Sequence, residues 1–486
     1  MIIAALALGC RPEPTAAPPA QSDPTLSSPT GAEEWVDPFA PQPDQSEGLT
    51  NVSDDLDALL EHGALNGACD AWEANPGDRR LELLCGKSMF FYEGFGTLGI
   101  PTVLIDTLPE LFPDELGPAF SRLGLVPHPT EPHGRPIGFG VGAPLGGNET
   151  LAMTCASCHF GPLGDGRYAV GAPNHGYAYG EHMLSILLIP AAASPLFRES
   201  DHDPEAIAAV RDVLDRLSDD PGVAIQLGLA LLPLLGVEVA TVAVEQEGEY
   251  ASWPPGTMDF VIDPLPIDDG VHTVSKISAL WGIPSDAEVE SAHMEHAMLA
   301  WAGSAHSLDQ FLQGFVQLGG GDVAAWPPER LAPLRSYIES LRAPEPLEPP
   351  DVDAVSRGEA VFRSAGCVEC HAGPRGSGAR IYTYDEIGTD AAMEAWADPD
   401  LDGEPCCGIG DTDTVLTHGI KSPRLTGSAY FGRFLHNGSL GTLEEVLCLS
   451  PRPDDRGEPW SDAGHTYGCD LPDDERAALA VYLRAH

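Results

Sequence analysis

Basic residues are scarce in this chain of 486 residues, which has 25 lysines and arginines against 74 aspartates and glutamates. The formal net charge is −49 at pH 7. Nucleic acids and anionic membrane surfaces attract positive charge, so this balance argues against both as partners. A strongly acidic surface keeps a protein soluble and equally suits a basic redox partner, and composition does not choose between these roles.

The chain also lacks an uninterrupted apolar run of transmembrane length. The longest candidate, residues 223–244, is broken by Gln226, Pro233 and Glu238. A membrane span there would also divide the two motifs described below across a bilayer. We therefore expect a buried helix pair, or the wall of an apolar access channel, at this place.

The first ten residues, MIIAALALGC, form a short apolar run that ends in Cys10. The run is similar to the end of a bacterial lipoprotein signal, although it is short and no basic residue precedes it. A start codon assigned too far downstream would explain both departures. Residues 11–50 are rich in proline, alanine and acids and are expected to form a disordered tether. These features predict a periplasmic lipoprotein of a Gram-negative bacterium that contacts the membrane only through its lipid anchor.

Cysteine is better represented, with 11 residues, and four of them lie in two C-x-x-C-H motifs, TCASCH and GCVECH. Chance would give roughly 0.008 such motifs at this composition. Two thiols at this spacing can both bond to one porphyrin, and the adjacent histidine can supply an imidazole to its iron. A redox dithiol or half of a zinc site would not need the histidine twice. The motifs predict two covalently bound haems c, at Cys155, Cys158 and His159 and at Cys367, Cys370 and His371.

Six cysteines remain besides Cys10, and an even number suits three disulfides in an oxidising compartment. Cys69 and Cys85 are the natural pair in the first half of the chain. The other four allow three pairings, among which the sequence does not choose: Cys406, Cys407, Cys448 and Cys469. Free buried thiols are the alternative.

Helical patterns dominate the chain, and strand signals are sparse. Two apolar stripes at helical spacing, in residues 329–344 and 475–486, look like one element used twice. In cytochrome c folds such a terminal helix packs across the haem-bearing helix. We therefore predict a mainly α fold with two cytochrome c-like haem domains and long loops. The N-terminal haem domain would cover residues 51–343, with insertions, and the C-terminal one residues 351–486.

Several segments together resemble the di-haem cytochrome c peroxidase superfamily, most closely the branch that contains the bacterial rubber oxygenases. They are RPIGFGVG, MTCASCHFGPL, VGAPNHG, KISALWGIP, EIGTD and KSPRLTGSAYFGRFLHNGSLGTLEEVL, and they span most of residues 80–486. The resemblance implies that His159 and His371 are the proximal ligands and that His436 is the distal ligand of the second haem. It also implies that Lys276 and Trp281 lie near the haems.

The residues themselves also bear on His436. The histidine is followed by Asn-Gly, which favours a tight turn that can point the ring inward. An ordinary loop histidine is the alternative.

The resemblance further implies that the distal face of the first haem is open to peroxide or dioxygen. The segment HMEHAMLAWAGSAHSLDQF stands where relatives carry a Trp-Asp-Gly-like motif, and Ala302 replaces the acid. This replacement puts a catalytic role of that position in doubt. His293 and His296 are candidates for a distal acid/base or ligand, and equally for a packed helix face.

The acidic stretch ADPDLDGEP offers half of a calcium loop. Asp398, Asp400 and Asp402 precede Gly403, but Ile409 stands where a bidentate glutamate belongs. A possible calcium site therefore competes here with a solvated acidic turn.

These observations favour a di-haem redox enzyme of the peroxidase type, in which the second haem passes electrons from a small redox protein to the first, where peroxide binds. One alternative is a rubber-oxygenase-like dioxygenase that acts on an apolar substrate. The other is a non-catalytic periplasmic electron carrier with two closed haems. Spectra and substrate turnover separate the three.

Overall fold

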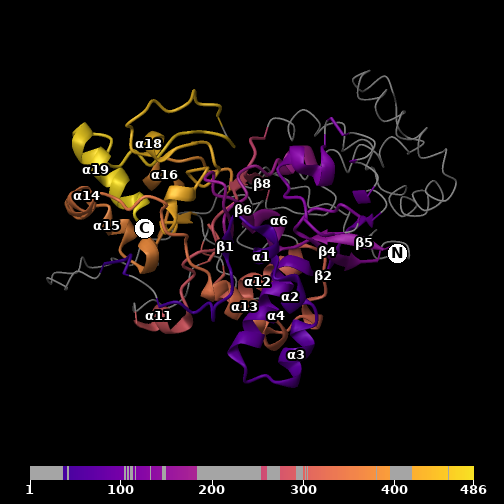
Figure 1. The fold of residues 1–486 in the computed structure, drawn as a ribbon. Helices are drawn as coiled ribbons and strands as arrows, with labels where there is room; N and C mark the ends of the chain where they lie inside the picture. Colours follow the sequence, from indigo (N-terminus) through magenta and orange to yellow (C-terminus); the bar gives the residue numbers. More distant parts are fainter. Residues whose placement is uncertain are drawn as a thin grey trace, which may run out of the picture.

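The computed structural model describes residues 37–182, 253–259, 274–291, 299–393 and 419–486, apart from short gaps in the first, fourth and last ranges. In Figure 1 the indigo and magenta N-terminal elements lie to one side of the molecule and the yellow C-terminal elements to the other. The predicted signal and most of the tether, and the apolar residues 223–244, lie outside the described part. Within that part, no helix has both the length and the apolar character needed to cross a membrane.

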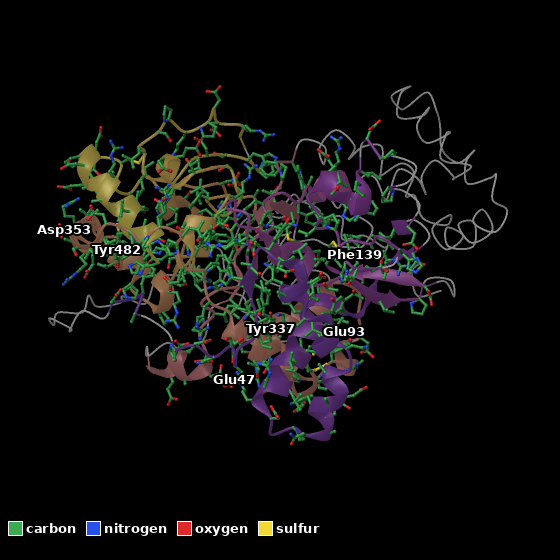
Figure 2. All side chains as sticks on the ribbon, in the orientation of Figure 1. Glu47, Glu93, Phe139, Tyr337, Asp353 and Tyr482 are labelled. Atoms are coloured by element: carbon green, nitrogen blue, oxygen red, sulfur yellow. A yellow bond between two sulfur atoms is a disulfide. The ribbon has the colours of Figure 1, made fainter. Side chains whose placement is uncertain are left out.

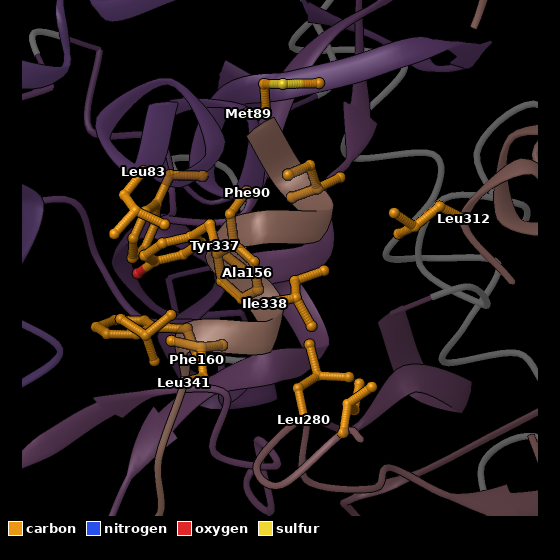
Figure 3. Packing of buried hydrophobic residues seen from close by; sticks show 14 of the residues in the cluster. Leu83, Met89, Phe90, Ala156, Phe160, Leu280, Leu312, Tyr337, Ile338 and Leu341 are labelled. Atoms are coloured by element: carbon orange, nitrogen blue, oxygen red, sulfur yellow. The ribbon is translucent and has the colours of Figure 1, made fainter. Parts of the chain in front are cut away.

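Helix α4 (Arg79–Tyr92) organises the N-terminal half. The carboxylate of Asp78 caps it by accepting a hydrogen bond from the backbone N–H of Leu81 at 3.1 Å. Its buried side packs against α13 (Pro328–Ser340), although α13 comes far later in the chain. Figure 3 shows Phe90 of α4 beside Tyr337 and Ile338 of α13 in this core.

The same arrangement occurs a second time in the C-terminal half. Helix α14 (Val352–Ser364) packs against α19 (Asp473–Arg484). Glycines make both crossings close: a Cβ at Gly86 would lie 2.0 Å from the carbonyl oxygen of Pro333, and one at Gly358 would lie 2.2 Å from that of Ala478. Tyr337 follows Pro333 by four residues, and Tyr482 follows Ala478 by four residues; Figure 2 labels both tyrosines. Both stripes predicted from the sequence are thus helices, and each packs on the helix that precedes a C-x-x-C-H motif.

The remaining helical elements are short. In chain order they are α1 (Leu56–Leu60), α2 (His62–Leu65), α3 (Ala68–Ala74), η2 (Pro118–Leu123), α6 (Cys155–His159), α11 (Asp286–Ser291), α12 (Leu308–Leu318), η5 (Val323–Ala325), α15 (Val368–His371), η6 (Pro374–Gly376), α16 (Tyr384–Ile387), η8 (Ser428–Tyr430) and α18 (Leu443–Val446). Long loops connect many of them.

The prediction of a mainly α fold is wrong. Helices take up only 39% of the described residues and strands 13%, and a cytochrome c fold is not shown. The strands form four small sheets among the described residues: β1–β7–β6 (Val52–Ser53, Tyr168–Val170, Phe160–Pro162), β2–β4–β5–β3 (Glu93–Leu98, Phe139–Ala143, Thr150–Met153, Ile100–Pro101), β8–β9 (Thr257–Asp259, Val274–Lys276) and β10–β11 (Ile381–Tyr382, Ile420–Lys421). All pairs are antiparallel except β2 with β4.

The strands escaped prediction because of their length and composition. None of those described exceeds six residues, and β2 and β4 read EGFGTL and FGVGA. Alternation of apolar and polar residues needs a longer run to be visible, and glycine is depleted in ordinary strands. In this sheet glycine is required, since a Cβ at Gly94 would lie 2.2 Å from the carbonyl oxygen of Val141.

Each half has its own hydrophobic core. One core joins α4 and α13 to Ala156, inside the first motif, and to Phe160, which directly follows it. Another joins α14 and α19 to Phe434 and Leu443 of the last third of the chain. The domain ranges 51–343 and 351–486 stay a prediction.

Candidate haem sites

The first motif forms α6, a single helical turn fixed to the N-terminal core. The Thr154 side chain accepts a hydrogen bond from the N–H of Ala156 at 3.3 Å and donates one to the carbonyl oxygen of Phe91 at 3.2 Å, which ties α6 to α4. The thiols of Cys155 and Cys158 are not in disulfides. Nδ1 of His159 lies 2.9 Å from the carbonyl oxygen of Ser278. A backbone contact therefore fixes the orientation of this imidazole.

The second motif repeats these features on α15. The thiols of Cys367 and Cys370 are also outside disulfides. Nδ1 of the buried His371 hydrogen-bonds to the carbonyl oxygen of Gly376 in η6. The carbonyl oxygen of Cys370 accepts a hydrogen bond from the hydroxyl of Ser422 at 2.6 Å. In each motif, therefore, the Nδ1 atom of the histidine is bound to a main-chain carbonyl oxygen.

Burial keeps both imidazoles neutral. It lowers the pKa of His159 and that of His371 to about 4 in each case. A neutral imidazole whose Nδ1–H donates to a carbonyl leaves Nε2 as the ligand atom, which is how metal-bound histidines are usually held. The two histidines therefore fit the role of proximal iron ligands.

Three of the four motif thiols lie in surroundings that disfavour the thiolate form. Burial raises the pKa of Cys155 and of Cys158 to about 12, and it also raises the pKa of Cys367. Redox-active and zinc-binding cysteines are thiolates with a lowered pKa. Covalent attachment to haem is consistent with the raised pKa of these three thiols, whereas the two alternatives weighed from the sequence are not favoured.

Three partly or fully buried arginines lie near the motifs. Arg424 donates to the carbonyl oxygens of Trp281 and Ala279 at 3.2 Å each. Burial is the main cause that lowers the pKa of Arg424, to about 10, and the positive charge of Arg375 is the second cause. The same two causes, in the same order, lower the pKa of Arg342. Arg375 pairs with the carboxylate of Glu288.

This arginine cluster has unused donors. The Nε atoms of Arg342 and Arg375 are buried and have no hydrogen-bond partner among the described residues. Buried guanidinium groups normally donate all of their hydrogens to partners. Additional carboxylates would satisfy them, and haem carries two propionates. Together with the free thiols and the fixed imidazoles, the cluster is compatible with bound haem.

Trp281 lies where the two halves of the chain meet. Its indole N–H donates to the carbonyl oxygen of Val170 at 2.9 Å. Its ring is so close to the C-terminal half that a Cβ at Gly427 would lie 2.4 Å from it. The tryptophan thus bridges the segment that follows the first motif and the segment that follows the second.

Lys276 and His436 lie together. The backbone N–H of Lys276 donates to the carbonyl oxygen of His436 at 2.8 Å. The Lys276 ammonium lies 5.5 Å from the ring centre of Trp301 and 4.9 Å from that of Phe431. Burial lowers the pKa of Lys276 to about 7, and burial together with the charge of Lys276 lowers that of His436 to about 4. Ring contacts with Trp301, at 6.4 Å, and Tyr384, at 6.2 Å, surround the imidazole of His436.

Other predicted site residues lie outside the described part. They are the candidate catalytic residues His293 and His296 and the possible calcium ligands Asp398, Asp400 and Asp402. Within the described ranges no group of three or more histidine, cysteine, aspartate or glutamate side chains could hold a metal ion.

The cysteine pairing is partly decided. Cys69 pairs with Cys85, as predicted, and Cys448 pairs with Cys469, so neither of these two is bonded to Cys406 or Cys407. Cys406 and Cys407 lie outside the described residues.

One residue near the second motif was missed in the sequence. The ring centre of His465 lies 6.4 Å from that of His371. His465 belongs to the loop that the Cys448–Cys469 disulfide closes. The sequence offered one signal, which is that His465 follows a glycine between two cysteines that could pair. A second histidine ligand has no fixed spacing from a C-x-x-C-H motif, so this signal was not specific.

Comparison with protein-family models gives no match, and none of the curated proteins matches the sequence. The argument for function therefore depends on the chemistry of the two motifs and their surroundings.

Proposed function

We propose that this chain is a di-haem c-type redox enzyme of the peroxidase kind. Electrons from a small redox protein would enter at the C-terminal site and be used at the N-terminal site to reduce peroxide. Each hydrogen peroxide would take two electrons and two protons and leave as two waters. Bound haem would supply iron that changes oxidation state and, at the N-terminal site, an open position for peroxide.

One observation carries this proposal. The C-x-x-C-H motif occurs twice, and in both copies the thiols are free and Nδ1 of the histidine is bound to a main-chain carbonyl, of Ser278 in one and of Gly376 in the other. A hydrogen bond at Nδ1 holds the ring at one angle and directs Nε2 to the metal. A structural cysteine pair would need neither feature.

The contacts between the halves support transfer between the two sites. Arg424 belongs to the C-terminal half, and it donates to carbonyl oxygens of Ala279 and Trp281. Those residues directly follow Ser278, which holds His159. Hydrogen bonds therefore connect the segment that holds the first imidazole to the second half of the chain. A fixed spacing between two redox centres is what a relay requires.

The family resemblance makes His436 one candidate for the distal ligand of the second haem. Its burial and its lowered pKa suit a ligand, and the same properties suit a packed histidine beside Trp301 and Tyr384. The arginine cluster of Arg342, Arg375 and Arg424 would hold the propionates.

The first experiment is expression of the full chain in a bacterial host with cytochrome c maturation. A pyridine haemochrome assay should give two covalent haems per chain. The double variant Cys155→Ser with Cys158→Ser should retain one haem, and so should Cys367→Ser with Cys370→Ser. A wild-type protein without covalent haem would overturn the proposal.

Turnover then distinguishes the enzyme from its alternatives. We expect peroxide-dependent oxidation of a reduced small cytochrome, and this activity should be lost in both double variants. Oxygen uptake with polyisoprene and no peroxide turnover would instead identify a dioxygenase. Fast electron exchange without either reaction, together with two fully low-spin haems, would identify a plain carrier.

A further inference from the structure

We propose that His465 is the second axial ligand of the C-terminal haem, on the side opposite His371. This inference rests on the proposed attachment of haem to Cys367 and Cys370. Metal–imidazole bonds are about 2 Å long, so an iron held between two imidazoles separates their ring centres by roughly 6 Å. The rings of His371 and His465 lie 6.4 Å apart.

The ring contacts distinguish His465 from His436. Among the described residues, the imidazole of His371 has ring contacts with His465 and Phe362. The ring contacts of His436 are with Trp301 and Tyr384 instead. Of the two candidate histidines, His465 is the one whose ring the fold places beside the proximal ligand.

The loop that carries His465 is held at several points. Arg452 donates to the carbonyl oxygens of Asp462 at 2.8 Å, Gly464 at 2.7 Å and His465 at 3.0 Å. The backbone N–H of His465 donates to the carbonyl oxygen of Ile387, the last residue of α16, at 3.2 Å. The disulfide between Cys448 and Cys469 closes the loop. An arginine that binds three carbonyl oxygens within four residues fixes the backbone from which the imidazole projects.

Two features of His465 are unfavourable unless a ligand completes the site. Its backbone has a φ of 47°, in the left-handed region that favours glycine. Its Nδ1 is buried and has no hydrogen-bond partner among the described residues. Strained residues and unsatisfied polar atoms collect at functional sites, where the bound group compensates for them. An iron bound to this nitrogen would give it a partner and would explain why a histidine occupies this position.

The test is spectroscopic and uses the complete haem-loaded chain. We expect His465→Gly to convert one of the two ferric haems from low spin to high spin in electron paramagnetic resonance and magnetic circular dichroism. Added imidazole should restore the low-spin signal. Glycine suits the positive φ, so this variant should fold. His465→Met should replace the bis-histidine signature with that of a histidine–methionine haem.

The matched control is His436→Gly. If His465 is the ligand, this variant keeps the bis-histidine signal of the second haem. Loss of the signal in His436→Gly and its retention in His465→Gly would overturn the inference and assign His436. Retention in both variants would overturn it as well, because the second haem then has another ligand. A pyridine haemochrome assay separates these outcomes from failure of the proposed function, since His465→Gly retains both thioether-bound haems.

Discussion

An alanine at Gly358 tests the close crossing of α14 and α19. A Cβ at this position would lie 2.2 Å from the carbonyl oxygen of Ala478 and 2.5 Å from the Cβ of Tyr482. Non-bonded carbon atoms do not approach other atoms this closely. The obstructing atoms belong to the main chain and to a Cβ, which cannot rotate away as the end of a flexible side chain can. The two helices would therefore have to move apart.

Two opposing effects determine the change in stability. In a helix interior alanine is more favourable than glycine by about 1 kcal/mol. Overpacking of a buried contact costs about 1–3 kcal/mol, and occasionally more. Because main chain must move across a buried interface, we expect the upper end of that range. Gly358→Ala should therefore lower the free energy of unfolding by about 2 kcal/mol, and Gly86→Ala should do the same at the crossing of α4 and α13.

Gly314 provides the matched control. It lies inside α12, and apart from its chain neighbours and the backbone of its own helix, no heavy atom of the described residues lies within 4 Å of the place that its Cβ would occupy. Helix propensity then acts alone, so Gly314→Ala should raise the free energy of unfolding by up to about 1 kcal/mol. Urea unfolding of the haem-loaded proteins, followed by far-ultraviolet circular dichroism, measures all three variants. If Gly358→Ala is as stable as the wild type, or gains stability as Gly314→Ala does, the close crossing does not exist.

Three further predictions concern charge, cross-links and the contact between the halves. Burial lowers the pKa of Lys276 from 10.5 to about 7, so between these pH values the unfolded chain holds a proton that the folded protein lacks. The free energy of unfolding of the wild type should therefore rise, relative to that of Lys276→Met, by up to about 1.4 kcal/mol per pH unit above pH 7. Urea titrations at pH 7, 8 and 9 measure this, and the same dependence on pH in both proteins would contradict it. Replacing both Cys448 and Cys469 by serine should cost about 3 kcal/mol in the same assay, because the closed loop no longer restricts the unfolded chain; an unchanged urea midpoint would show that the bond is absent. Trp281→Phe removes the hydrogen bond to the buried carbonyl oxygen of Val170 and should cost about 1–3 kcal/mol, whereas a neutral result would mean that water or another donor replaces the indole.

The helices and the sheets differed in how far they could be predicted. Residues 329–344 and 475–486 carry apolar side chains at helical spacing, and α13 and α19 occupy these segments. Helical periodicity is a local property, so the sequence displays it directly. The sheets depend on pairing between short glycine-rich segments, as between Gly94 and Val141, and this pairing leaves no local pattern. The prediction of a mainly α fold failed for this reason.

The sequence by itself determined that two thiols and an imidazole lie within five positions in each motif, and from this spacing it predicts haem attachment, because such groups share one turn of chain whatever the rest of the molecule does. It also predicted that Cys69 and Cys85, the two spare cysteines of the first half, pair with each other, and the structure confirms this pair. Only the tertiary structure decided which groups surround each imidazole. The neighbours of His371 include His465, from a loop far along the chain. Contacts of this kind arise from the packing of whole elements, and no spacing within a single segment encodes them.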